Sequence, residues 1–235
     1  KRDLYPGELM YGISSPHLDI LVSDKHDKVV KGGSHTCKNW LKQKAKNVAK
    51  RNSMFRIPVS GLLEAEGSNL TYDELMLLGW YLSDGTINKK TNSLSISQSV
   101  NKPFVNEIRN TLINCGLKFS ERINKRPKDS PEAHGDIVVF NISKGAPRGT
   151  DKHLRGWAHL EEWLCKSVPE CYNKLTREEF KVLLKAWNHG DGLTNHQSLD
   201  YVKHTLTITI GDNYHMGDRL QELCVTRGFR CNLAI

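Results

Sequence analysis

The sequence predicts a mixed α/β (α+β) fold built from two related halves, preceded by a small, mostly β segment. Two observations predict the halves. An apolar run ending in Asp-Gly occurs twice, at 77–85 and 183–192, and a strand-like run of leucine or isoleucine alternating with small hydroxyls follows each, at 93–97 and 205–209. A duplicated pattern of this kind indicates a duplicated structural unit. We therefore divide the chain into 1–70, 71–175 and 176–235, the last half being cut short relative to the one before it.

Both apolar runs are predicted to be helices. Thr71 with Glu74, and Thr176 with Glu179, have the spacing of a capping box, in which the two side chains satisfy free backbone amides of the first turn. Small residues recur four positions apart in each run, at 79 and 83 and at 186 and 190. Such spacing places them on one helix face and permits close approach of two backbones. We expect the two helices to pack on each other.

Each predicted helix ends in an aspartate, Asp84 or Asp191. A helix C-terminus carries partial negative charge and favours cations, so a carboxylate is poorly placed there. If the helices are parallel, the two carboxylates meet and repel unless they share a proton or a cation. A divalent ion such as Mg²⁺ or Mn²⁺ suits oxygen ligands of this kind. The alternative is that each Asp-Gly only stops a helix, with glycine in the left-handed C′ position.

The repetition continues downstream of both runs. Leu94 stands as far before Gly116 as Leu206 stands before Gly228, and the intervening apolar positions also correspond. Each half is therefore predicted to continue from its first helix through a strand and a second helix to another strand. The strict alternation predicts a sheet with one buried side and one open side lined by hydroxyls.

These residues resemble the LAGLIDADG homing endonucleases, and more narrowly the members carried inside inteins. The first run matches the family motif position by position, and the second matches its usual partner form, with Ala186 where glycine is commoner. The block Lys166-Ser167-Val168-Pro169 before the second run is similar to the Lys-x-Ile-Pro block of intein endonucleases. The likeness spans residues 71–235.

The N-terminal segment resembles part of an intein splicing (Hint) domain. Residues 19–26, DILVSDKH, look like a block in which a strand ends in Thr/Ser-x-x-His, so that Ser23 and His26 would be a remnant of the splicing motif. Nothing at Lys1 resembles an intein nucleophile, and the His-Asn end that splicing needs is missing, so we do not expect splicing by this chain alone.

The same segment is strongly basic. Only Asp27 opposes the lysines and arginines at 25, 28, 31, 38, 42, 44, 46, 50, 51 and 56. This block is typical of a surface that binds a polyanion, and the alternative is a solvated surface segment.

The family resemblance implies two pseudo-twofold-related αββαββ-like repeats, with paired central helices and a β saddle over double-stranded DNA. It implies a monomer that hydrolyses phosphodiester bonds within a long pseudo-palindromic target, with Asp84 and Asp191 holding Mg²⁺ or Mn²⁺. Lys166 would supply positive charge or orient water, and Gln98 would position water. The counterpart of Lys166 in the second repeat would fall beyond Ile235, so we expect the second centre to lack its lysine.

The expected DNA contacts come from the hydroxyl strands, which contact either base type, and from basic side chains that grip phosphate. These residues are Ser93, Ser95, Ser97, Lys118, Arg122, Lys125, Arg126, Thr205, Thr207, Thr209 and Arg230.

Composition agrees with this interpretation. The 235 residues carry a net charge of +8 and are 38% hydrophobic, with no apolar run long enough for a membrane span and no signal peptide. We expect an intracellular, DNA-associated protein with reduced cysteines.

Three functions stay open: a site-specific double-strand DNA endonuclease, a non-catalytic DNA-binding regulator or maturase on the same scaffold, and an intein fragment that acts in protein splicing. Both acids and Lys166 favour the first.

Overall fold

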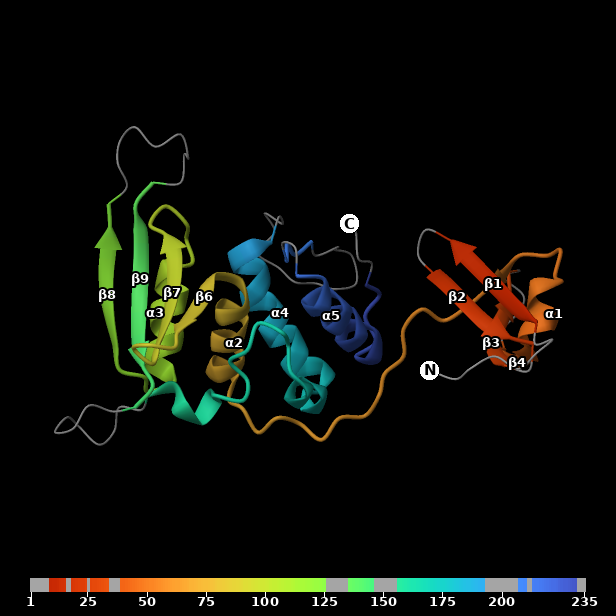
Figure 1. Cartoon of the computed structure of the whole chain (residues 1–235), viewed down its shortest axis with the longest axis horizontal. Helices are drawn as coiled ribbons and strands as arrows, with labels where there is room; N and C mark the ends of the chain where they lie inside the picture. Colours follow the sequence, from red (N-terminus) through yellow and green to blue (C-terminus); the bar gives the residue numbers. More distant parts are fainter. Residues whose placement is uncertain are drawn as a thin grey trace. The chain divides into compact units, whose positions relative to one another are not determined.

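The computed structural model describes residues 9–15, 18–24, 26–33, 39–125, 135–145, 156–192, 207–210 and 213–231. The chain forms two compact units, one of residues 1–63 with 224–235 and the other of residues 64–223. The predicted α+β class is confirmed, because the described residues contain five α-helices and three antiparallel sheets (Figure 1).

The first half of the duplicated region is complete in the larger unit. Its order is α2 (Tyr72–Asp84), β6 (Gly85–Asn88), β7 (Ser93–Ser99), α3 (Val105–Asn114), β8 (Phe119–Asn124) and β9 (Ile137–Ser143). The strands form one antiparallel sheet in the order β6-β7-β9-β8 (Figure 1). This half therefore has the αββαββ order expected of a repeat. Two short 3₁₀ helices, η1 (Trp157–Leu160) and η2 (Glu170–Lys174), lie between it and the second half.

The second half is described in part, as α4 (Arg177–Asp191), residues 207–210 and α5 (Tyr214–Thr226). The predicted strand at 205–209 begins outside the described residues, but Ile208 forms an antiparallel bridge with Gly192. In the first half Ile96 pairs with Gly85 in the same way. The register predicted between the two halves is therefore confirmed at this point.

The second helices of the two halves, α3 and α5, end in the same way. Gly116 after α3 and Gly228 after α5 have φ of 65° and 77°, the left-handed conformation that glycine adopts without strain. The amide of Leu117 donates to Leu112 O at 3.0 Å, and that of Phe229 donates to Cys224 O at 2.8 Å. Both ends thus close as Schellman-type caps.

Helices α2 and α4 pack side by side along their small residues (Figure 1). A Cβ added at Gly79 would lie 2.3 Å from Leu183 O and 2.6 Å from Ala186 Cβ, and one at Gly190 would lie 2.4 Å from Ser83 Cβ. The contacts advance in the same direction along both helices, so the helices are parallel. Both predicted capping boxes are present, at the N-termini of α2 and α4.

The four-stranded sheet has one buried and one open side. Along β7, Leu94, Ile96 and Gln98 are buried, whereas the serines between them are half-buried. Helix α3 lies on the buried side, where Arg109 bonds Glu121 of β8 and lies over the ring of Phe140. The alternating pattern predicted for this strand is confirmed.

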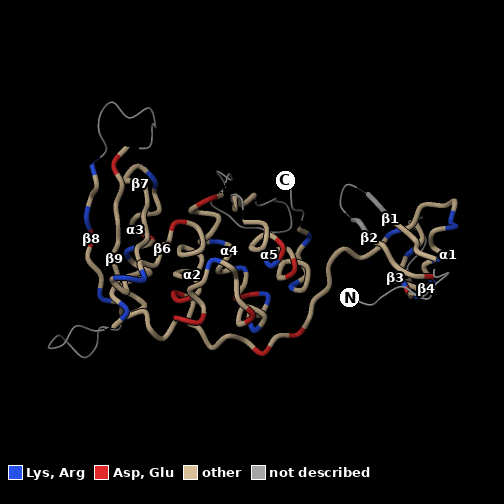
Figure 2. The backbone as a smooth tube through the Cα atoms, viewed as in Figure 1, with Lys and Arg blue, Asp and Glu red and all other residues tan. Residues whose placement is uncertain are grey.

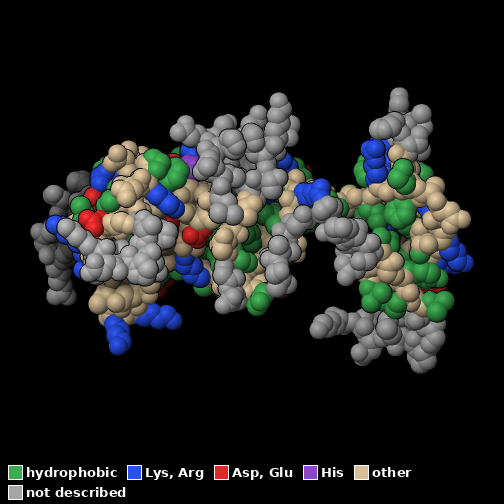
Figure 3. Space-filling model, turned by 90° about the horizontal axis from the view of Figure 1, so that it is seen from above, with side chains coloured by type: hydrophobic (Ala, Val, Ile, Leu, Met, Phe, Trp, Pro, Cys, Tyr) green, Lys and Arg blue, Asp and Glu red, His purple; other side chains and the backbone are tan. Residues whose placement is uncertain are grey.

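The smaller unit holds a hairpin and a second sheet around a short helix. Its elements are β1 (Met10–Ser15), β2 (Leu18–Ser23), β3 (Asp27–Gly32), β4 (Leu41–Lys44), α1 (Ala45–Ala49) and β5 (Phe55–Arg56). Strand β1 pairs with β2, and β3 lies between β4 and β5. Its small core includes Val30, Ala45 and Val48, while Leu21, Trp40 and Met54 are exposed. Figure 3 shows hydrophobic side chains at the surface of this unit.

The helix contact predicts that Gly79→Ala destabilises the protein. The new methyl group would overlap the Leu183 carbonyl, and overpacking of this kind costs about 1–3 kcal/mol of the free energy of unfolding. Urea denaturation measures the loss. Gly145→Ala is the matched control, because a Cβ there meets nothing within 4 Å. Equal effects of the two substitutions would contradict the close helix contact.

Candidate functional site

The parallel packing of α2 and α4 brings the two terminal aspartates to one end of the helix pair. A Cβ on Gly190 would lie 2.6 Å from Asp84 Oδ2, so the Asp84 carboxylate rests against the residue that precedes Asp191. Both aspartates are partly buried. The predicted meeting of two carboxylates at adjacent helix C-termini is therefore present.

The glycines after these aspartates have a different role from a left-handed helix stop. Gly85 and Gly192 have φ of −89° and −81°, in extended backbone that any residue adopts. A Cβ at Gly85 would lie 2.5 Å from Tyr81 Cα, and one at Gly192 would lie 2.1 Å from Asn188 Oδ1. Glycine is needed because the chain turns back against its own helix. The alternative of a simple left-handed stop does not hold.

The surroundings of the two carboxylates disfavour their charged forms. Burial, with the charge of Asp191 as a second cause, raises the pKa of Asp84 to about 6. Burial also raises the pKa of Asp191. Lys102 and Lys166 oppose both shifts without cancelling them. The arrangement therefore favours a bound proton or an additional cation at this end of the helix pair.

A lysine lies at the end of each helix. Lys166 Nζ donates to Leu82 O at 2.6 Å and to Ser83 O at 3.0 Å, in the last turn of α2. Lys102 Nζ donates to Gly190 O at 2.9 Å, in the last turn of α4. Each ammonium group thus satisfies carbonyls that a helix leaves free and complements the local dipole.

The lysine charges act crosswise on the acids. Lys166 acts more strongly on Asp191 than Lys102 does, whereas Lys102 acts more strongly than Lys166 on Asp84. Burial lowers the pKa of the Lys166 ammonium, and Asp191 and then Asp84 partly offset that change. Lys102 of the first repeat therefore places a second lysine charge beside the two acids, and the expectation that the second repeat lacks its own counterpart of Lys166 stays a prediction. No sequence motif marks Lys102, and the residue that it bonds, Gly190, lies in the other repeat.

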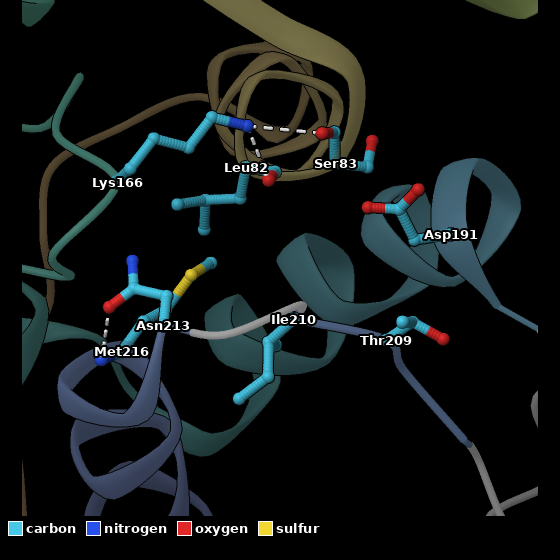
Figure 4. Close-up of a pocket in the computed structure, with 8 residues that line it drawn as sticks. All are labelled: Leu82, Ser83, Lys166, Asp191, Thr209, Ile210, Asn213 and Met216. Atoms are coloured by element: carbon cyan, nitrogen blue, oxygen red, sulfur yellow. Dashed lines mark hydrogen bonds between the residues drawn. The ribbon is translucent and has the colours of Figure 1, made fainter.

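A cavity of ≈ 360 Å³ opens beside Asp191 (Figure 4). Its lining residues are Leu82, Ser83, Lys166, Asp191, Thr209, Ile210, Asn213 and Met216.

Gln98, only 5% exposed, donates from Nε2 to Asp84 Oδ2 at 3.3 Å. Its counterpart by register, Ile210, lies beside the other acid in the cavity. The structure therefore groups Asp84 with Gln98 and Lys102, and Asp191 with Lys166 and Ile210.

The donor set fits a hard divalent cation. The described residues contain no cluster of three or more His, Cys, Asp or Glu side chains. Mg²⁺ needs no such cluster, because it is usually bound by one or two carboxylates and keeps several waters or phosphate oxygens. Asp84 and Asp191 provide carboxylates of this kind, with raised pKa values that a nearby cation would lower again.

The residues predicted to contact DNA lie in several places. Ser93, Ser95 and Ser97 share the open side of the sheet, and the pairing of β7 through β9 to β8 places Arg122 on that side too. Lys118 directly precedes β8, and Figure 2 shows basic residues along this strand. Exposed positions include Lys125, Thr207, Thr209 and, in the smaller unit, Arg230, whereas Arg126 and Thr205 lie outside the described residues.

The residues of the splicing-like motif lie in the smaller unit. Ser23 ends β2 and His26 directly precedes β3. The amide of His26 donates to Ser23 O at 3.1 Å, so the backbones of the two motif residues are in contact.

No family model matches the chain, and no curated protein matches it. No helix in the described part of the chain is long and apolar enough to cross a membrane. The assignment of the site therefore rests on its own residues and their geometry.

The raised pKa of Asp84 predicts that stability falls as pH rises. Between the ordinary pKa of 3.8 and the folded-state value of about 6, the native protein keeps a proton that the unfolded chain has lost. Asp84→Asn should therefore be more stable than the wild type by about 1–2 kcal/mol above this window, and the difference should vanish below it.

Urea denaturation of both proteins at several pH values in a chelating buffer measures this difference. Asp218→Asn, on the exposed side of α5, is the control. A pH-independent gap between wild type and Asp84→Asn would contradict the assignment of the shift to Asp84.

Proposed function

We propose that this protein is a site-specific, metal-dependent endonuclease of double-stranded DNA, similar to the LAGLIDADG homing endonucleases. One observation carries the proposal: two carboxylates meet at the C-termini of parallel helices, and a lysine stands at each helix end. A protein that only binds DNA gains nothing from two partly buried carboxylates, because they repel the phosphates. Their presence is explained if they hold cations that face the substrate.

The chemistry follows from the charges at this site. Divalent ions held by Asp84 and Asp191 would supply Lewis acidity for hydrolysis of a phosphodiester. Lys166 and Lys102 would stabilise the negative charge that develops on the phosphate oxygens. Gln98 would orient water beside Asp84 through its side-chain amide, which already bonds that carboxylate. The proposed cofactor is therefore Mg²⁺ or Mn²⁺.

The open side of the sheet supports DNA as the substrate. It carries the serines of β7 in a regular row, and Arg122 of the edge strand β8 lies on the same side, one strand further across the sheet beyond β9. Hydroxyls contact either base type in the major groove, and basic side chains grip phosphate. Two related halves on one chain suit a long pseudo-palindromic target bound by a monomer. The net charge of +8 favours association with such a polyanion inside the cell.

The proposal is tested by incubating the protein and Mg²⁺ with a library of randomised DNA duplexes and sequencing the cut ends. Recovery of one long, roughly symmetrical sequence is expected. Retention of such a sequence without cutting would instead indicate the non-catalytic DNA-binding function. Cutting without any recovered sequence preference would contradict site specificity.

Cleavage is predicted to require both acids. Asp84→Asn and Asp191→Asn should each reduce cutting of the selected target by at least about a hundredfold, since each removes a ligand of the proposed cation. DNA affinity should stay equal or rise, because removing negative charge eases the approach of phosphate. Plasmid cleavage and fluorescence anisotropy measure the two effects, with Asp218→Asn as control. Full double-strand cutting by Asp84→Asn would refute this assignment.

The two lysines are predicted to serve different strands. Lys166→Ala should slow the cut made beside Asp191, and Lys102→Ala the cut made beside Asp84, each by roughly a hundredfold. A target labelled separately on each strand should then show nicks on opposite strands in the two variants. Lys181→Ala, whose ammonium pairs with Glu178 on the surface of α4, is the control. Nicking of the same strand by both variants would contradict the crosswise pairing.

A further inference from the structure

The turn that carries Lys166 has an unfavourable backbone conformation. The amide of Val168 donates to Cys165 O at 3.2 Å and closes the turn. Val168 has φ of +53°, which is strained for a β-branched residue, and it precedes Pro169, where an extended conformation is the normal one. Its side chain is 1% exposed. A conformation of this kind persists only when surrounding groups hold it in place.

Arg219 of α5 holds this turn from outside. Its Nε donates to Val168 O at 3.3 Å, and Nη2 donates to Asn173 Oδ1 at 3.1 Å. Nη1 pairs with Glu222 one turn further along α5. The Arg219 side chain is only 16% exposed. A planar guanidinium with three partners in different segments has little freedom, so it joins the turn rigidly to η2 and α5.

The position of the turn decides where the Lys166 ammonium can lie. Lys166 is the second residue of the turn. From there its Nζ must reach the carbonyl oxygens of Leu82 and Ser83, which belong to α2. A lysine side chain is long and flexible, so the location of its charge depends on a fixed starting point. A relaxed Val168 would move that starting point.

We propose that Arg219 is a positioning residue for Lys166: it holds the Cys165–Val168 turn in its strained form and so fixes the ammonium group at the end of α2. No motif marks Arg219, which lies in α5 and bonds the backbone of the turn. The effect on cleavage rests on the proposed function, whereas the placement of Lys166 does not.

The placement is tested by the carbonyl ¹³C chemical shifts of Leu82 and Ser83 in labelled protein. Lys166→Ala gives the shifts expected when the ammonium group is absent. Arg219→Ala should move both shifts toward those values, and Arg219→Lys, which keeps the charge without the planar fork, should move them part of the way. Glu222→Ala is the matched control, because it removes a partner of Arg219 and leaves the bond to Val168 intact. Unchanged shifts in folded Arg219→Ala or Arg219→Lys protein would overturn the proposal.

A double-mutant cycle in the cleavage assay supplies the second test. Arg219→Ala should lower kcat for the strand cut beside Asp191 by about tenfold to a hundredfold without changing KM. In the Lys166→Ala background it should cause no further loss, because the group it positions is gone. Equal losses in both backgrounds would show a purely structural role and overturn the proposal. If the wild type cuts no DNA, the proposed function fails, and the carbonyl shifts still decide whether Arg219 positions Lys166.

Discussion

The close approach of α2 and α4 is the constraint on which the rest of the structure depends. Gly79 against Ala186, and Ser83 against Gly190, leave no room for a larger side chain, so the two helices meet almost backbone to backbone. Their parallel direction places both terminal aspartates at one end. Removal of water from these carboxylates is the direct consequence, and it is the first cause of the raised pKa of Asp84 and of Asp191.

Each lysine bonds carbonyl oxygens at the end of one helix, and it is the stronger of the two in lowering the pKa of the aspartate that ends the other helix. Such crosswise support fits the pseudo-twofold relation of the halves, although the two lysines come from unrelated sequence positions. Lys102 lies shortly after β7, whereas Lys166 lies in the turn before η2. The raised pKa values show that their charges do not fully compensate for burial. The remaining imbalance is what a divalent ion would remove under the proposed function.

Local signals predicted the parts of this structure that depend on nearby residues. The capping boxes fixed the start of both motif helices, the small-residue spacing predicted their contact, and the repeated interval to Gly116 and Gly228 predicted two equivalent helix ends. The placement of Lys102 could not be predicted, because its partner Gly190 lies in the other repeat. The conformation of Val168 could not be predicted from sequence either, since a valine before a proline indicates extended backbone and the bond from Arg219 comes from far along the chain.

The two halves of the site differ in the side chain that accompanies each acid. Gln98 bonds Asp84, whereas Ile210 offers no polar group and lines a cavity beside Asp191. The two acids therefore differ in the protein side chain that stands at this register position. Under the proposed function, the Gln98 amide would order water beside Asp84, and the polar side chains of Thr209 and Asn213, which line the cavity, would be the groups available to do so beside Asp191.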